Sequence, residues 1–210
     1  MKLTFTSFFL AVVICFSAQS PQEFFKHGTK LTYLGIDYSH AKFIGQFSQF
    51  SDAGDIGVVS IKKTYFGSWN GVVYKERDKY NLSDMLRKEL IVYSINDITR
   101  INSTTKVDDM EAVYAVEYNK NDIQNFISSY EFKVKDGIGF LFLAEFLDKN
   151  IDLACFHFVA INMSNKEVLI HKRYTESPGG FGLRNYWIRP IYDIIKKIKS
   201  NDYNKWKHSF

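Results

Sequence analysis

The stretch "GIGFLFLAEFLDKNIDLACFHFVAINMSNKEVLIHKRY", residues 137–174, decides the fold of this chain. It contains three runs rich in β-branched and aromatic residues, separated only by "DKNID" (148–152) and "SN" (164–165). Runs of this composition, bounded by turn residues, predict strands. Turns this short can join only antiparallel neighbours, because a parallel return needs a dozen or more residues. The sequence therefore predicts an antiparallel meander in the carboxy-terminal half.

The segment after the meander joins a glycine-rich turn to a helix. "SPGGFGLRNYWIRPIYDIIKKIK" (177–199) passes through Pro178 and three glycines into an apolar pattern with helical spacing. Glycines permit the positive φ that a tight turn needs. The apolar residues share one face, which predicts a helix that closes the fold on the sheet: Trp187, Ile191, Ile194, Ile195 and Ile198.

Upstream of the meander, strand and helix patterns alternate. "KLTYLGIDY" (30–38) and "LIVYSI" (90–95) predict strands because they are rich in β-branched and aromatic residues. Apolar spacing predicts a long helix over 54–77, and "NKNDIQNFISSY" (119–130) predicts a short one capped near its first asparagines. The expected fold is α/β (α+β): a single-domain sandwich on a mixed sheet, with a carboxy-terminal antiparallel meander and a closing carboxy-terminal helix.

The remaining segments carry weaker patterns. We expect 21–30 to be a loose polar lead-in and 96–110 to be an exposed loop, while 110–118 fits either a strand or a helix. Ser83 is expected to cap a short helical turn, because its hydroxyl can accept an amide left free at a helix start. No internal repeat or linker divides the chain, so we expect one domain.

The first 20 residues, "MKLTFTSFFLAVVICFSAQS", have the order of a secretory signal peptide: a positive charge, an apolar run and small residues. The run is shorter than the roughly 20 apolar residues of a membrane span. A lipoprotein would need Cys15 as its modified residue, but Ile14 precedes it where that signal normally has a small residue. We therefore expect cleavage, a secreted or periplasmic protein without a transmembrane segment, a domain over 21–200 and a polar tail over 201–210.

Composition and charge bound the function. Apolar residues make up 46% of the chain and aromatic residues 17%, which predicts a folded core rather than disorder. The net charge is +4, and from Arg184 onward seven basic residues stand against two acidic ones. Without a dense basic cluster we expect no nucleic-acid partner. The basic carboxy-terminal segment is either a solvated helix face, which we favour, or a surface that touches an anionic partner.

"GGFGLRN" (179–185) lies where a dinucleotide-binding loop would lie, after a strand and before a helix. It lacks the third glycine, and no following strand completes the βαβ unit that such a loop requires. We therefore interpret the Gly179–Gly182 loop as a structural turn. The alternative is a helix start that holds an anion or a small ligand. The residues that would bind it are Gly180, Gly182, Arg184, Asn185 and Arg189.

Two other groups contain catalytic residue types. Cys155 and His157 are two residues apart on a strand, hence on one face, but we expect the cysteine to be a buried apolar side chain. Asp37, Ser39 and His40 are too close in sequence for a triad, whose members converge from separate elements, and Asp37 is expected to make turn hydrogen bonds. We assign no catalytic residue.

No metal ligand or cofactor site is assigned either. Asp148-x-Asn150-x-Asp152 imitates the start of a calcium loop, but Leu153 and Val159 stand where the loop needs glycine and glutamate. The histidines show no spacing typical of a zinc site. We expect 148–152 to be a hairpin turn.

"YLGIDYS" (33–39), "GIGFLFLAEFLDK" (137–149) and "GGFGLRNYW" (179–187) together resemble a family of uncharacterised secreted proteins of Bacteroidetes. That family carries an "IDxS" strand, a "GxGxVF" strand and a closing "GGFGxRNYW" turn and helix. Pro190 departs from the pattern, which expects a helix former there. The resemblance implies no activity. The matching residues are Gly137, Gly139, Gly180, Gly182, Arg184, Asn185, Tyr186 and Trp187.

The element order is also similar to envelope accessory domains, namely curli-secretion-type lipoproteins and the amino-terminal domain of TolB. Their aspartate-threonine-glycine turn is replaced here by residues 163–166, "MSNK". Fold likeness alone does not establish function. We expect an exported, non-enzymatic cell-envelope protein that binds a macromolecule, or alternatively a protein or enzyme that binds a small ligand or anion at the Gly179–Gly182 loop.

Overall fold

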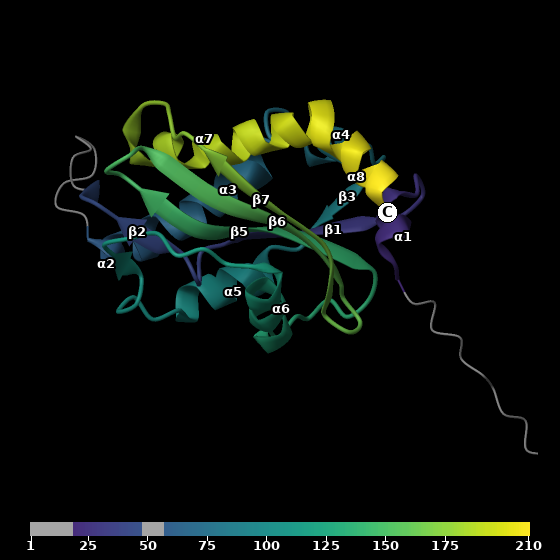
Figure 1. The fold of residues 1–210 in the computed structure, drawn as a ribbon, viewed down its shortest axis with the longest axis horizontal. Coiled ribbons are helices and arrows are strands. Elements are labelled where there is room, and N and C mark those ends of the chain that lie inside the picture. Colours follow the sequence, from purple (N-terminus) through teal and green to yellow (C-terminus); the bar gives the residue numbers. More distant parts are fainter. Residues whose placement is uncertain (1–18, 48–56) are drawn as a thin grey trace, which may run out of the picture.

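The computed structural model describes residues 19–47 and 57–210. Helices cover both faces of one sheet, so the molecule has three layers (Figure 1). The expected signal peptide, apart from its last two residues, and the first residues of the expected helix over 54–77 lie outside the described residues. The predicted single-domain α/β fold on a mixed sheet is confirmed.

The sheet is built around β5, its longest strand. On one side of β5, β1 and β2 follow one another along the same edge, β1 against residues 138–143 and β2 against residues 146–148, both parallel to β5. On the other side, β6 and β7 complete the predicted antiparallel meander. The strands are β1 (Leu31–Asp37), β2 (Lys42–Ile44), β3 (Ile91–Tyr93), β4 (Glu111–Ala112), β5 (Ile138–Asp148), β6 (Leu153–Asn162) and β7 (Glu167–Glu176).

The outer edge of the parallel half is covered only in part. β3 pairs with residues 31–33 of β1, and β4 pairs with residues 43–44 of β2, both in parallel. Between these pairings, the outer edge of the chain has no neighbouring strand among the described residues. This gap lies where β1 ends, and it positions the site described below.

Within the described residues, most of the helices lie on one face of the sheet and the others lie on the opposite face (Figure 1). The predicted closing helix packs as expected, with all five residues of its apolar face buried. The first face holds α1 (Pro21–Phe25), α2 (Val58–Ile61), the π-helical η2 (Lys62–Phe66), α3 (Gly67–Lys75), α4 (Leu82–Met85), α7 (Gly182–Lys197), η3 (Ile198–Asp202) and α8 (Tyr203–Ser209). The second holds α5 (Asn96–Thr104) and α6 (Lys120–Ser129).

Several local expectations were wrong. Residues 21–25 of the expected lead-in form α1, which buries Phe24 and Phe25. The expected polar tail continues the closing helix through η3 and α8, and Trp206 is buried. Asn81, not Ser83, caps α4, by accepting the amide of Asp84. In the first two cases, long-range packing of aromatic side chains outweighs a polar local composition.

The expected exposed loop over 96–110 contains the most consequential difference. Its first nine residues form α5, which packs on β1 and buries Ile98 and Asn102. The segment has few apolar residues, so its hydrophobic pattern is too weak to predict a helix. The helix is stabilised instead by tertiary contacts, including hydrogen bonds from buried polar side chains.

Candidate functional site

The uncovered edge of β1 is bound by two asparagine side chains instead of a strand. Asn70 of α3 accepts the amide of Ile36 at 2.7 Å and donates to the Ile36 carbonyl at 2.8 Å. Asn102 of α5 accepts the amide of Tyr38 at 2.8 Å and donates to the same Ile36 carbonyl at 2.9 Å. Both asparagines are buried. The main-chain groups of β1 that would otherwise be unpaired are therefore satisfied by side chains from two helices.

Gly35 makes this close approach feasible. Its φ is +118°, and a Cβ built there would lie 2.8 Å from the Asn70 side-chain oxygen. Any other residue would have to displace the amide and adopt an unfavourable backbone conformation. The residue is also where the β1–β5 register shifts, which is typical of a bulge.

A cavity of about 490 Å³ lies between these two helical segments. One wall is a stripe of residues at intervals of three and four along α2, η2 and α3, and the other is a similar stripe on α5. Because Asn70 and Asn102 belong to the two walls and bind the end of β1, the cavity lies at the carboxyl end of that strand. The lining residues are Val59, Lys62, Lys63, Phe66, Gly67, Asn70, Thr99, Asn102, Ser103 and Val107.

The polar groups in the cavity wall are largely committed to the protein. Asn70 uses its oxygen and both amide hydrogens, the second hydrogen bonding Phe66 at 3.2 Å. The hydroxyls of Thr99 and Ser103 donate to carbonyls of their own helix at 2.8 and 2.7 Å. The Lys62 ammonium donates to the Thr105 carbonyl. The interior of the cavity therefore offers a ligand mainly apolar contacts.

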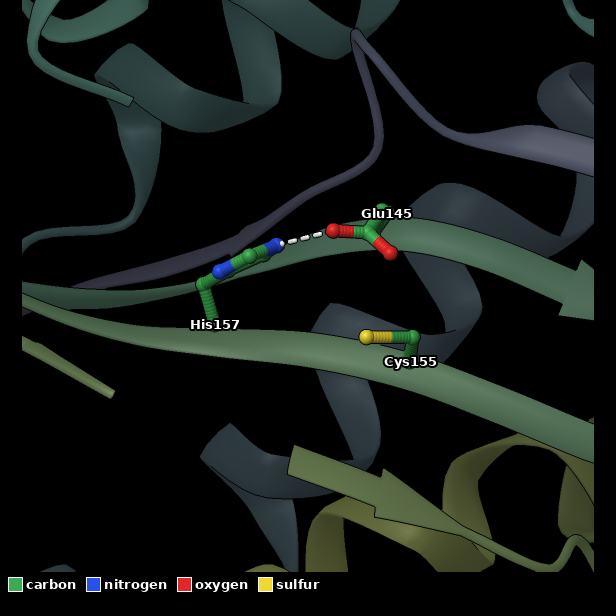
Figure 2. A group of neighbouring side chains, drawn as sticks. All are labelled: Glu145, Cys155 and His157. Atoms are coloured by element: carbon green, nitrogen blue, oxygen red, sulfur yellow. Dashed lines mark hydrogen bonds and ion pairs between the residues drawn. The ribbon is translucent and has the colours of Figure 1, made fainter. Parts of the chain in front are cut away.

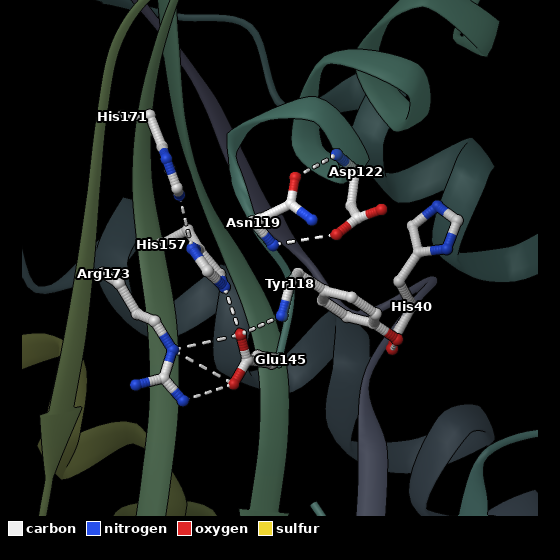
Figure 3. A network of polar contacts seen from close by, with 8 residues as sticks. All are labelled: His40, Tyr118, Asn119, Asp122, Glu145, His157, His171 and Arg173. Atoms are coloured by element: carbon white, nitrogen blue, oxygen red, sulfur yellow. Dashed lines mark hydrogen bonds and ion pairs between the residues drawn. The ribbon is translucent and has the colours of Figure 1, made fainter. Parts of the chain in front are cut away.

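A second polar group is centred on Glu145 of β5 (Figure 3). The β5–β6 register shifts between Ala144 and Phe146, so Glu145 has no strand partner there and occupies a bulge. Its buried carboxylate accepts from His157 at 2.7 Å, from Arg173 at 2.6 Å and from the Tyr118 amide at 2.9 Å. Burial raises the pKa of Glu145, but hydrogen bonds from His157 and Arg173 outweigh burial and lower it to about 2.

The cluster reaches the surface through β7. His157 and His171 are joined by a ring nitrogen contact of 2.7 Å between Nδ1 and Nε2 (Figure 3). Burial, together with the charge of neighbouring His157, lowers the pKa of His171 to about 4. Glu145 and His157 are thus bonded to each other and to β7. The arrangement links the three meander strands rather than presenting a free base to a substrate.

Cys155 lies beside this cluster (Figure 2). Ligand atoms of Glu145, Cys155 and His157 lie within 4.8 Å of one another, which is compatible in distance with a metal ion. However, the carboxylate already holds the Arg173 guanidinium, whose positive charge would repel a metal. Burial raises the pKa of Cys155 far above its ordinary value, which disfavours the thiolate that a metal needs. The chemistry of this set does not fit a metal site, and Cys155 is buried as predicted.

The residues Asp37, Ser39 and His40 are not arranged as a triad. The Asp37 carboxylate accepts the Ser39 amide at 2.8 Å, as the turn interpretation predicts, and also the Tyr130 hydroxyl. The Ser39 hydroxyl lies 3.0 Å from that of Tyr130. The His40 ring stacks on Phe126 with centroids 3.6 Å apart. The serine is therefore bonded to a tyrosine rather than to an imidazole.

The Gly179–Gly182 loop folds back on its own helix. Gly180 and Gly182 have φ of +107° and +78°, which explains the glycines. Asn185 donates to the Phe181 carbonyl at 3.0 Å, and the exposed Arg184 side chain donates to Asn185 at 3.1 Å. The Arg184 carbonyl accepts from the Trp69 indole at 3.0 Å. The bond between the Trp69 indole and the Arg184 main chain ties this segment to α3.

Arg189, the last of the expected ligand residues, pairs with Asp193 at 2.6 Å on the same helix. Other basic residues of the closing helix also pair within the chain, including Lys197 with Glu176 and Lys199 with Asp84. Residues 148–152, which imitate the start of a calcium loop in sequence, form the expected hairpin turn. In it, Asp148 accepts the Asn150 amide at 2.9 Å.

Sequence reasoning missed Asn70, Asn102 and Glu145. Glu145 could have been found, because a single carboxylate within the apolar run 140–147 must have partners if the strand is buried. The two asparagines had no such signal. Asn102 lies in the segment expected to be an exposed loop, yet at 3% exposure it is buried.

Comparison of the chain with protein-family models, curated proteins and solved structures gave no match. The resemblance to secreted Bacteroidetes proteins therefore stays a prediction. Within residues 19–47 and 57–210, none of the helices has both the length and the apolar character needed to cross a bilayer.

Proposed function

We propose that this protein is a binding domain that holds a small, mainly apolar molecule in the cavity between η2–α3 and α5. The observation that carries the proposal is the position of the cavity. The cavity lies at the carboxyl end of β1. The helices between β1 and β3 cover one face of the sheet, and the helices between β3 and β5 cover the other. Open α/β sheets bind ligands at such switch points.

The size and rigidity of the cavity support the same function. Its volume of about 490 Å³ lies within the roughly 300–1,000 Å³ typical of small-molecule sites. Asn70 and Asn102 tie both walls to one strand, so the spacing of the walls is set before a ligand arrives. A preformed site avoids the free-energy cost of ordering its walls during binding.

This proposal belongs to the class of the alternative expected from sequence, a small-ligand-binding protein, but moves the site from the Gly179–Gly182 loop to the cavity. We do not include catalysis, because both ring nitrogens of His157 and the Glu145 carboxylate are engaged by other protein groups. Export to the envelope, with a macromolecular partner there, stays a prediction from sequence.

The test uses two glycines of one helix. Gly67 lines the cavity, and Gly71, one turn further, does not. Apart from the adjacent residues and the backbone of the helix itself, no described atom lies within 4 Å of a Cβ built at either position, and neither residue has positive φ, so both positions have room for a side chain. Leucine also has the higher helix propensity, by up to about 1 kcal/mol. Gly67→Leu and Gly71→Leu should therefore both fold, which melting curves will verify.

The neutral fluorophore N-phenyl-1-naphthylamine serves as the probe. We expect saturable binding to the wild-type chain, a loss of about tenfold or more in affinity for Gly67→Leu, and wild-type affinity for Gly71→Leu. A wild-type chain that does not bind the probe saturably, or equal affinities for all three proteins, would contradict the proposal.

A further inference from the structure

The cavity differs sharply between its interior and its mouth. In the interior, Asn70 donates both of its amide hydrogens to main-chain carbonyls and accepts the Ile36 amide, and Phe66 contributes only apolar surface. A polar group of a ligand placed there would lose its water and find few partners, which costs free energy. The buried part of the ligand is therefore apolar.

Two lysines of the cavity lining, in contrast, are charged and reach solvent. Lys62 is half-buried, and its ammonium reaches from η2 to the Thr105 carbonyl at the end of α5. An ammonium has three hydrogens to donate, and this contact uses one. Lys63 follows Lys62 and is exposed. Within the described part of the chain, neither lysine pairs with a carboxylate, whereas Lys79, Lys197 and Lys199 do.

Capping of α5 explains part of the role of Lys62. A positive charge at a helix carboxyl end is favourable, and Thr105 is the residue that ends α5. Among the described residues, that role leaves the other hydrogens of Lys62 and the whole of the Lys63 ammonium without a hydrogen-bond or ion-pair partner. Both side chains line the cavity, so a ligand that enters it meets them.

Two acidic residues of the described part of the chain also lie near the cavity. Asp108 and Glu111 line a small neighbouring depression that shares Val59 and Val107 with the cavity. An anionic group would be repelled by these carboxylates and attracted to Lys62 and Lys63, which line the cavity itself. The two lysines thus favour a ligand whose acid lies at Lys62 and Lys63 and whose apolar body lies between the helices.

We propose that the ligand of this cavity is an amphipathic monoanion, with an apolar body and one carboxylate held by Lys62 and Lys63. This inference rests on the proposed function, since it names the ligand class for the same site. A medium-chain alkyl carboxylate has this chemistry. Hydrogen bonds between an ammonium and a carboxylate are stronger than those between neutral groups, so the charged end adds both affinity and orientation.

The experiment measures displacement of N-phenyl-1-naphthylamine from the full chain by three ligands with the same alkyl tail: dodecanoate, dodecanol and dodecyltrimethylammonium. The two ions are used below their micelle concentrations and dodecanol below its solubility limit. We expect dodecanoate to bind about tenfold more tightly than dodecanol, and the cation to bind most weakly. Added salt should reduce the preference for dodecanoate, because the lysines are partly exposed.

A double variant, Lys62→Gln with Lys63→Gln, should bring the affinity for dodecanoate down to that for dodecanol while leaving the affinity for dodecanol unchanged. Glutamine keeps an amide donor for Thr105, and a melting curve checks that α5 is intact. Lys75→Gln, at the end of α3 and outside the cavity lining, is the matched control and should keep the preference.

The outcomes separate the two proposals. If dodecanol and dodecanoate bind equally and Gly67→Leu weakens both, the cavity binds ligands but the inference about charge is wrong. If the double variant keeps the preference for dodecanoate, another group holds the acid and the inference is again wrong. If no ligand displaces the probe and Gly67→Leu has no effect, the proposed function itself fails.

Discussion

Asn70 and Asn102 lie on helices that cover opposite faces of the sheet, yet both donate to the carbonyl oxygen of Ile36, at 2.8 and 2.9 Å. Together they occupy the edge of β1 that β3 leaves uncovered. The two helices are consequently fixed against one strand, and the space between them is the cavity. The missing strand pairing and the cavity are thus parts of one arrangement.

The first prediction concerns these asparagines. Asn70→Leu leaves the Ile36 amide without a partner, and Asn102→Leu does the same to the Tyr38 amide. An unpaired buried group costs about 1–3 kcal/mol, so each variant should lose at least that much unfolding free energy in denaturant titrations. The exposed Asn201→Ala should change it by less than about 0.5 kcal/mol.

The double variant Asn70→Leu with Asn102→Leu gives a sharper result. Because both amides donate to one carbonyl, the two losses should not add, and the coupling should be about 0.5–3 kcal/mol. Strict additivity would show that the shared carbonyl does not link the helices energetically.

The second prediction concerns the pH dependence of stability. The pKa of His171 is lowered to about 4 in the folded protein, chiefly by burial. The unfolded chain, whose histidine has its ordinary pKa near 6.5, then binds more protons between those values. Stability should fall as pH drops from about 6.5 to about 4. The pKa of Glu145, lowered to about 2, adds a further loss below about pH 4.5.

Denaturant titrations across the pH range for wild type and His171→Gln check this prediction. The variant should lose much of the slope between pH 6.5 and 4 and keep the acid loss below pH 4.5. His27→Gln, at an exposed site, is the control. A His171→Gln profile parallel to wild type over the whole range would count against the cluster as the cause.

The third prediction concerns the thiol of Cys155. The side chain is fully buried, and burial raises its pKa well above the ordinary value. In a Cys15→Ser background, Ellman's reagent should react slowly with the native protein and rapidly after denaturation. Rapid reaction in the native state would mean that the thiol is accessible.

The fourth prediction concerns the joint between the glycine loop and the closing helix. Trp187 is fully buried, so Trp187→Ala should cost about 3–5 kcal/mol. Gly182→Val should also destabilise strongly, because φ is +78° there. Arg184→Ala should be nearly neutral, because its carbonyl, not its side chain, contacts Trp69. Melting curves decide, and a large loss for Arg184→Ala would reveal a structural role for the guanidinium.

Local sequence was sufficient for the elements whose stabilising groups are close together in the chain. The meander follows from three apolar runs and their short turns. Helix α6 follows from Asn119, whose side chain accepts the amide of Asp122 while the Asp122 carboxylate accepts the Asn119 amide. The apolar face of α7 follows from the spacing of its isoleucines. Each signal spans one or two helical turns or a single hairpin, so reading the chain locally recovers it.

Tertiary structure alone decided α5, the burial of the carboxy-terminal tail and the candidate site. Asn70 and Asn102 meet Ile36 across 34 and 66 residues of chain, and no local pattern encodes such a contact. Their role arises because β3 is too short to cover β1, which leaves buried main-chain groups that must find partners. The partners come from whichever side chains the packed helices bring there, so the cavity between the helices exists only once both faces of the sheet are covered.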